Sequence, residues 1–488
     1  MPIPSIRPAA ALAVALVLAL IEPPAARAVD IELPSLGDAS SATVSPAVER
    51  KIGDAWLRMF RGQVKTVQDP LLQDYLEHVV FDLATHSQLP EAKLHVVVVD
   101  NQTINAFAVP GGVVGLHNGL MTSAMHEDEL ASVISHELAH LSQRHYARSV
   151  EEARRNAIPN MLMLLGSLVV AATASGQGGM AAIAAGQAAI QQQQLRFSRA
   201  NEREADRIGM LTLVDAGYDA DGMPRMFTRM LESVRYNTRR PPEFLLSHPV
   251  TESRVADAKN RARNMPNHGE GRVDSDDFSL MQARVRVGFD ETPGYAIKRF
   301  RAEIEKDGGL SVGNRYGLVL ALTRASEFEA ARKELAPLLR DKPESIPIAI
   351  AAADLDLQSG HLTDAEERLQ SQLALNPGNH PLTMALSDTL QREGKPAEAE
   401  TLLVAHVKAY PGDPLVWYSL AEVHGLAGHV LDVHRARAEY FILNGALDQA
   451  ERQLGYALNL AEGSFTDTAG IQARIADIRA MREEMKKL

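Results

Sequence analysis

The C-terminal third of the chain repeats with a period of 34 residues. Small residues and prolines recur at this interval, and small residues let two helices pack closely while proline ends the second helix of a pair. Such a unit buries its apolar face only by stacking on its neighbours, so residues 311–488 are predicted to form an α-solenoid with a concave surface. The recurring positions are Pro343, Pro377 and Pro411, then Gly360, Gly394 and Gly428, and finally Ala331, Ala365 and Ala399.

A helix pair of this length is typical of tetratricopeptide repeats. The pattern weakens near the end, because Val433 stands where the next alanine is expected and Gly445 where the next proline is expected. It restarts near Asp448, and residues 471–488 are predicted to form a charged capping helix. The repeats either bind a partner on their concave surface or only stabilise the rest of the chain.

A second signal is the His-Glu-x-x-His motif formed by residues 136–140. The residues before it have the apolar spacing of a helix, and three acidic residues, 127–129, stand where a helix N-terminus favours negative charge. Residues four apart share one helix face, so His136 and His140 can bind one Zn²⁺. Glu137 can then reach a water molecule beside the metal.

A catalytic zinc site needs a third protein ligand. His145 is the nearest candidate, but the residues around it do not fit the longer motif that uses a third histidine. The better candidate is Glu202, with Asp206 four residues later on the same face of a predicted helix. Glu202 can ligate the metal, and Asp206 can accept the free ring N–H of a ligand histidine. The alternative is a solvated acidic helix face.

These motifs resemble those of the gluzincin peptidases that include HtpX and the CAAX prenyl protease. Residues 105–112 resemble the segment before the zinc helix in that family, and Ser247-His248-Pro249 with Arg254 resembles its closing motif. The resemblance implies a mainly α protein in which an α+β zinc-peptidase domain with a small sheet precedes the repeats. It also implies one Zn²⁺ per chain, with His136, His140 and Glu202 as ligands and Glu137 as the catalytic base. Mn²⁺ or Co²⁺ can also occupy such ligands in vitro.

The segment before the zinc helix predicts the sheet. Residues 94–100 are β-branched and apolar, as in a buried strand, and residues 105–120 contain a Pro-Gly-Gly turn, as in a hairpin or a bent edge strand. In peptidases of this kind an edge strand binds an extended substrate by strand addition, which favours unfolded targets. The predicted substrate-binding residues are Asn105, Ala106, Phe107, Gly111 and Gly112.

Two residues of the closing motif have several interpretations. His248 either stabilises the oxyanion, or occupies the fourth metal position and keeps the enzyme latent, or only packs beside a helix capped by Ser247 or Thr251. Arg254 either pairs with a carboxylate near the site, or contacts substrate, or lies on the surface.

The N-terminus is predicted to be a signal peptide. Arg7 precedes an apolar run over residues 9–21, and Ala26-Arg27-Ala28 fits a small-x-small cleavage site, so residues 1–28 are expected to be removed in the periplasm. The chain has no cysteine, which excludes disulfides, and a formal charge of −12, which argues against nucleic acid as a partner.

The mature chain is expected to have a zinc metalloprotease domain at 29–265, a linker with helices leading into the repeats at 266–310, and the repeat domain at 311–488. The apolar segment 158–190 is either a helical hairpin beside the active site, in contact with lipid or an unfolded client, or a pair of core helices.

The resemblance implies an endopeptidase that degrades misfolded or stalled outer-membrane proteins, with repeats that engage the machinery for β-barrel assembly. Two alternatives remain: a chaperone or scaffold with a latent zinc site, and a protease that processes one precursor.

Overall fold

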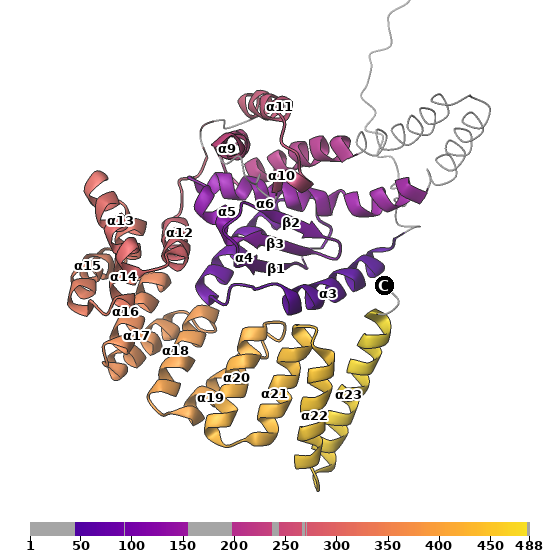
Figure 1. Cartoon of the computed structure of the whole chain (residues 1–488), viewed down its shortest axis with the longest axis vertical. Coiled ribbons are helices and arrows are strands. Elements are labelled where there is room, and N and C mark those ends of the chain that lie inside the picture. The colour runs from indigo at the N-terminus through magenta and orange to yellow at the C-terminus, as the bar shows by residue number, and fades with distance from the viewer. Residues whose placement is uncertain are drawn as a thin grey trace, which may run out of the picture.

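A computed structural model describes residues 44–91, 93–154, 198–236, 244–265, 269 and 271–485. The predicted signal peptide and the apolar segment 158–190 lie outside these residues. Within them the protein is mainly helical with one small sheet, which confirms the expected fold class (Figure 1). No helix in this part of the chain is long and apolar enough to cross a membrane.

The sheet has three strands, β1 (His95–Val99), β2 (Ala106–Val109) and β3 (Val113–His117), in the order β1-β3-β2. β1 is parallel to β3, and β2 is antiparallel to it. The predicted strand and hairpin are therefore confirmed, and β2 is an edge strand. The hairpin turn requires glycine, because Gly111 has a φ of 90° and a β-carbon there would lie 2.4 Å from the Glu49 carbonyl oxygen.

Helices cover both faces of the sheet. On one face, α3 stacks Trp56 against Phe60 with ring centroids 4.5 Å apart, and both rings contact Phe107 of β2. On the other face, α4 and α6 share the main apolar core with β1 and β3. The helices of this region are α3 (Pro46–Gln63), α4 (Pro70–Thr85), α5 (Asn118–Ser123), α6 (Glu127–Ser142), α9 (Gly222–Tyr236), α10 (Phe244–Ser247) and α11 (Glu252–Arg263).

α6 begins at the acidic residues 127–129, as its sequence predicts, and these side chains are buried. Glu129 is fully buried, accepts a hydrogen bond from the backbone N–H of Met125 at 2.8 Å, and forms an ion pair with Arg229 of α9 at 3.0 Å. Glu127 accepts from the hydroxyl of Tyr75 on α4 at 2.8 Å. The charges therefore complement the helix dipole and also fix α6 against its neighbours.

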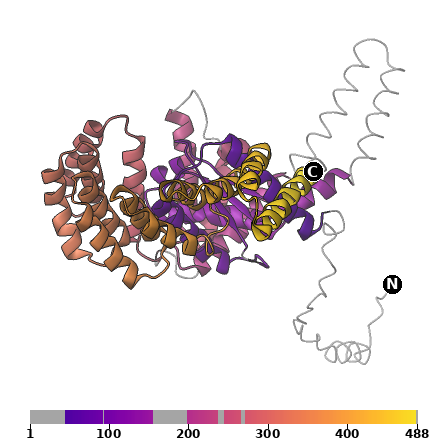
Figure 2. The ribbon, with the colours of Figure 1, turned by 90° about the horizontal axis from the view of Figure 1, so that it is seen from below.

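Ten helices form the C-terminal solenoid, which curves around the sheet-containing region (Figures 1 and 2). The recurring alanines are buried between paired helices, and the recurring glycines lie in the turns with positive φ. The repeat prediction is thus confirmed, although the last helix begins six residues before the predicted start at 471. Two helices, α12 (Asp276–Phe289) and α13 (Pro293–Lys306), lead into the solenoid. The solenoid helices are α14 (Val312–Arg324), α15 (Phe328–Asp341), α16 (Ile346–Gln358), α17 (Leu362–Leu375), α18 (His380–Arg392), α19 (Pro396–His406), α20 (Pro414–Ala427), α21 (Val430–Leu443), α22 (Leu447–Leu460) and α23 (Phe465–Met485).

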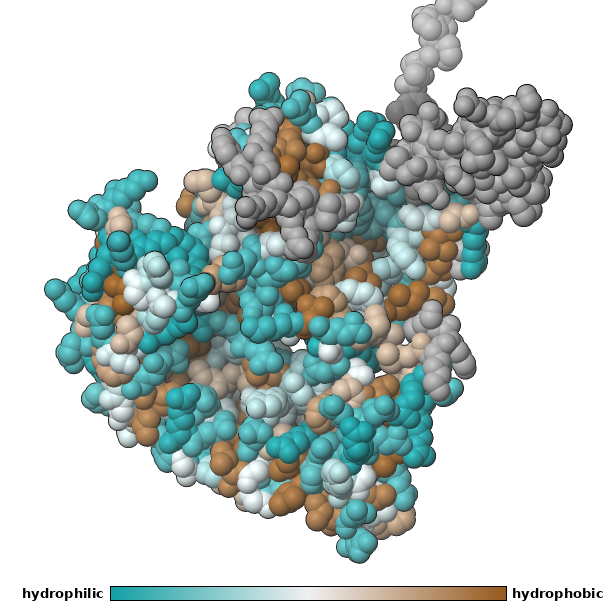
Figure 3. Space-filling view, viewed as in Figure 1, coloured by the Kyte–Doolittle hydropathy of each residue, from teal (hydrophilic) through white to brown (hydrophobic). Residues whose placement is uncertain are grey.

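The solenoid docks on the first region through α18, which contacts α4, and α21, which contacts α3. Gly62 and Gly445 lie where the two backbones meet. A β-carbon on Gly62 would lie 2.5 Å from the Asn444 carbonyl oxygen, and one on Gly445 would lie 2.6 Å from the Arg58 carbonyl oxygen. The face of the molecule shown in Figure 3 mixes hydrophilic and hydrophobic residues.

A buried histidine pair lies close to this contact. The rings of His380 and His406 are stacked, with 2.9 Å between Nδ1 of the first and Nε2 of the second. Nε2 of His380 lies 3.3 Å from a carboxylate oxygen of Asp413. Burial, together with the adjacent His380 ring, lowers the pKa of His406 from 6.5 to about 4.

This pair should make the free energy of unfolding depend on pH. Between pH 6.5 and 4 the unfolded chain binds a proton at residue 406 that the folded chain does not, so stability falls as the pH falls through this window. We expect wild type to lose about 1–3 kcal/mol more than His406→Phe between pH 7 and pH 4.5. Thermal melting of both proteins at the two pH values checks this, and parallel pH profiles would contradict it.

Candidate metal centre

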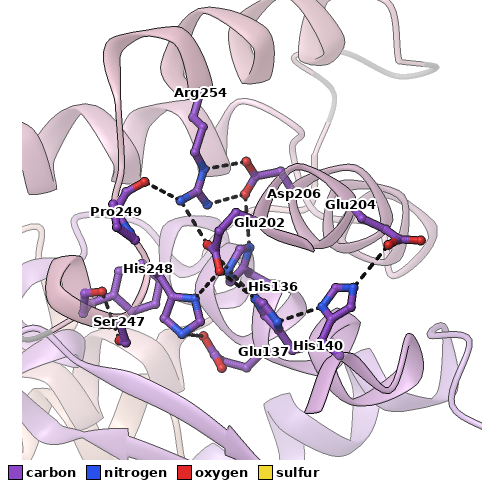
Figure 4. A network of polar contacts seen from close by, with 12 residues as sticks. His136, Glu137, His140, Glu202, Glu204, Asp206, Ser247, His248, Pro249 and Arg254 are labelled. Carbon is purple, nitrogen blue, oxygen red and sulfur yellow. Dashed lines mark hydrogen bonds and ion pairs between the residues drawn. The ribbon is translucent and has the colours of Figure 1, made fainter. Parts of the chain in front are cut away.

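The site forms where the helical residues 198–215 cross α6. Gly209 allows the close approach, because a β-carbon there would lie only 3.0 Å from the backbone nitrogen of His136 and from the carbonyl oxygen of Ser135. Nothing in the sequence periodicity singles out this glycine. Its effect is to bring Glu202 and Asp206 to the face of α6 that carries both motif histidines (Figure 4).

Three side chains direct their polar atoms to one point. Nε2 of His136 lies 3.1 Å from Nε2 of His140, and each of these nitrogens lies 3.5 Å from an oxygen of Glu202. Tetrahedral Zn²⁺ with bonds of about 2.0–2.1 Å has ligand atoms about 3.3 Å apart. Two imidazole nitrogens and the Glu202 carboxylate, with one oxygen facing each imidazole, therefore fit zinc in both chemistry and size.

The outer nitrogen of His136 is held by a carboxylate. Nδ1 lies 3.1 Å from Oδ1 of Asp206, the residue that the sequence predicts as the partner of a ligand histidine. Asp206 in turn receives Nε and Nη2 of Arg254 at 2.8 and 2.7 Å. Arg254 also lies 3.1 Å from Glu202 and donates to the Pro249 carbonyl, and it is 5% exposed. A surface position for Arg254 is therefore wrong, and the geometry favours carboxylate pairing over a contact with substrate.

The charges of the site are strongly coupled. Burial opposes ionisation of Glu202, but hydrogen bonds from His136 and His248 outweigh it and lower the pKa of Glu202. Burial would likewise lower the pKa of His136, yet the hydrogen bonds to Asp206 and Glu202 raise it to about 9. Burial and the neighbouring His136 charge lower the pKa of His140 well below its usual value. Glu202 and Asp206 are thus ionised, and together they favour a positive charge beside them.

Glu137 and His248 face the same point from the other side. Oε1 of Glu137 is buried and has no hydrogen-bond partner among the described residues, and it lies 3.7 Å from Nε2 of His248. Nδ1 of His248 lies 3.0 Å from Oε1 of Glu202, so His248 joins the three candidate ligands in one group. Thr251, one of the two caps that the sequence offered, caps α11 by accepting from the backbone N–H of Arg254.

A cavity of about 1020 Å³ opens onto these residues. Phe107, Gly111 and Gly112 of the predicted substrate segment line it, together with Glu137, His140 and His248. Asn105, Ala106 and Arg254 are not among the lining residues. Ala106 is fully buried, and the amide of Asn105 contacts His117 at 3.4 Å.

His145 is close to the site but is not part of the group of candidate ligands. Its Nδ1 lies 2.9 Å from Nδ1 of His140, on the side of that ring away from Glu202. The sequence offered His145 only as a possible ligand, and helical spacing gives no signal for the contact that it makes instead.

A second group of metal-binding side chains lies in the solenoid but is closed by hydrogen bonds. Nδ1 of His424 and Nδ1 of His429 both lie 2.6 Å from the same oxygen of Glu400. These distances are those of hydrogen bonds and leave no room for a cation between the atoms. Of the two groups, only the one on α6 has the spacing of a metal site.

Known families and proteins match both halves of the chain. Residues 70–262 match the model of peptidase family M48, and residues 356–423 match a tetratricopeptide repeat model. The beta-barrel assembly-enhancing protease of Escherichia coli O157:H7 is 34% identical over 98% of this chain and 97% of its own length. The protein of the same name from Yersinia pestis is 34% identical over 93% of each chain. The mitochondrial metalloendopeptidase OMA1 of Schizosaccharomyces pombe is 28% identical over 37% of this chain and half of its own.

The buried pairing of Arg254 predicts a large loss of stability on its removal. Arg254→Met leaves Asp206 and Glu202 without their guanidinium, and breaking a buried ion pair in this way costs about 3–5 kcal/mol. Arg263→Met, an exposed position on the same helix, should cost less than about 0.5 kcal/mol. Urea unfolding of the metal-free proteins compares them, and equal midpoints would contradict the pairing.

Proposed function

The chain belongs to peptidase family M48 and to its beta-barrel assembly-enhancing proteases, and we propose that it is a zinc-dependent endopeptidase of the gluzincin type. The observation that carries this proposal is the convergence of His136, His140 and Glu202 at distances of 3.1–3.5 Å. These residues hold one Zn²⁺, and the bound ion supplies Lewis acidity to the scissile carbonyl and to the attacking water.

The residues around the metal supply proton transfer and hold the ligands in place. Glu137 accepts the proton of the attacking water at Oε1 and then delivers it to the leaving amine, a role that suits a buried oxygen with no hydrogen-bond partner among the described residues. Oδ1 of Asp206 lies 3.1 Å from Nδ1 of His136, in position to accept the proton that Nδ1 carries when Nε2 binds the metal. Arg254 balances the charge of Asp206 and Glu202 and fixes both carboxylates.

Substrate enters as an extended chain along β2. This strand is the edge of the sheet, it packs against α6, and Phe107 and the turn glycines line the cavity beside the metal site. An added strand is held mainly by backbone hydrogen bonds, so unfolded segments of many sequences fit. The enzyme therefore acts on misfolded or stalled proteins in preference to folded ones.

The site of action is the periplasm, where the N-terminal segment 1–28 directs the chain and is removed. The substrates are outer-membrane proteins that fail to assemble, in keeping with the name of the relatives that match nearly the whole chain. The tetratricopeptide repeats recruit these substrates or the β-barrel assembly complex. Any chaperone-like activity also resides in the repeats.

His248 acts as a fourth, displaceable ligand in this proposal. Its ring lies between Glu137 and Glu202, 3.7 and 3.0 Å away, where it shields the position that water and substrate need. Such a ligand keeps the protease latent until a substrate or partner moves the segment that carries it.

Substitution of Glu137 separates catalysis from metal binding. Glu137→Gln should bind one zinc ion per chain, as wild type does, while casein cleavage falls by at least about 100-fold. His136→Ala or Glu202→Gln should lose the metal as well, and a chelator should abolish wild-type cleavage. Glu329→Gln, an exposed position on α15, is the matched control and should leave both properties unchanged. Should wild type and Glu137→Gln both bind zinc, both fail to cleave, and both prevent aggregation, the protein is a chaperone with a latent site.

Removal of His248 tests the latency. His248→Ala should retain zinc and cleave casein several-fold faster than wild type, because the fourth position is open. A fall of about 100-fold with zinc retained would instead assign the oxyanion role to His248. Metal content and casein hydrolysis are measured on the same preparations.

A further inference from the structure

The two candidate histidine ligands have different partners on their outer nitrogens. Nδ1 of His136 meets a carboxylate, Asp206, whereas Nδ1 of His140 meets another imidazole, Nδ1 of His145, at 2.9 Å. A ligand histidine must keep the lone pair on Nε2 free for the metal, and its Nδ1 must therefore carry the proton. His140 needs a hydrogen-bond acceptor at Nδ1, and His145 is in the position to supply it.

The rest of the contact chain fixes the direction of these hydrogen bonds. When Nδ1 of His145 accepts from His140, its own proton is on Nε2, which lies 3.3 Å from Oε2 of Glu204. That same oxygen accepts from Nη1 of Arg148 at 2.8 Å. Each donor thus meets an acceptor, from Nδ1 of His140 through His145 to a carboxylate that an arginine holds in place.

An unusual turn brings His145 to this position. α6 ends at Ser142, and Arg144 then adopts a φ of 51°, a left-handed conformation that non-glycine residues rarely take. The Arg144 guanidinium holds the turn by donating to the Val44 carbonyl at 2.6 Å and to Glu49 at 3.2 Å. The helical residues that begin at His145 therefore place its ring, only 5% exposed, beside His140.

We propose that His145 is a positioning residue for the metal: it fixes the tautomer and the ring orientation of His140 by accepting its Nδ1–H, and Glu204 and Arg148 support it. The proposal rests on the zinc site of the preceding section. It extends the protein's metal-binding machinery onto the helix after the His-Glu-x-x-His motif.

The test compares a substitution that removes the acceptor with one that restores it. His145→Phe keeps a ring but has no acceptor, and should weaken zinc binding by about 10–100-fold. His145→Asn places its side-chain oxygen where Nδ1 was, and should restore binding to within about threefold of wild type. His126→Phe, at the opposite end of α6, is the matched control and should bind zinc as wild type does. Zinc affinity is measured on the full chain by competition with a chelating dye.

The outcomes separate this proposal from the proposed function. If wild type binds zinc tightly and folded His145→Phe binds it within about twofold as well, the role of His145 is overturned and the metal site stands. Equal weakening by Phe and Asn, in proteins that melt at the wild-type temperature, also overturns it. If wild type itself binds no zinc, the proposed function fails. If His145→Phe does not fold, the comparison of Asn with wild type decides, since a loss of about tenfold or more in the folded Asn variant overturns the acceptor role.

Discussion

The contact between α6 and the helical residues 198–215 is the interaction on which the rest of the structure depends. The two segments are separated in the sequence by a long apolar stretch, yet they approach so closely that a β-carbon at position 209 would lie 3.0 Å from the backbone of α6. The small residues Ala139 and Ala205 are buried beside this crossing. The close approach sets the distance from the imidazoles of one helix to the carboxylates of the other, because buried, closely packed side chains have little freedom to compensate for a shift of the backbone.

The charges buried at this crossing constrain the neighbouring elements. Two carboxylates away from water are costly unless positive groups accompany them. Arg254 of α11 supplies one such group, and its carbonyl contact to Pro249 ties the segment that carries His248 to the same network. The position of His248 is therefore coupled to the charge state of the site rather than set by local packing alone. At its N-terminus, α6 is fixed by a separate set of ion pairs to α9, so the helix that carries the motif is held at both ends.

Periodicity made much of this fold predictable. The 34-residue interval identified the solenoid, the valine run identified β1, and the Pro-Gly-Gly turn identified the hairpin, since each follows from rules that act over a few residues. The candidate ligands could be named because His136, His140 and Glu202 stand in a spaced motif pattern. Three features could not be predicted. The contact at Gly209 arises between segments that are distant in the sequence. The contact of His145 depends on one residue in the left-handed conformation. Gly445 departs from the repeat pattern, and the structure shows that it contacts α3.

The meeting of Gly62 and Gly445 has a consequence for how the molecule varies. A free solenoid tolerates gain or loss of whole units, because each unit touches only its neighbours. Here α18 contacts α4 and α21 contacts α3. The distance between α18 and α21 must therefore match the distance between α4 and α3 on the peptidase domain. Insertion of a repeat between α18 and α21 would move one of these helices away from its contact by the width of a helix pair. The peptidase domain thus fixes the number of repeats between α18 and α21. Repeats can be gained or lost only at the two ends of the solenoid.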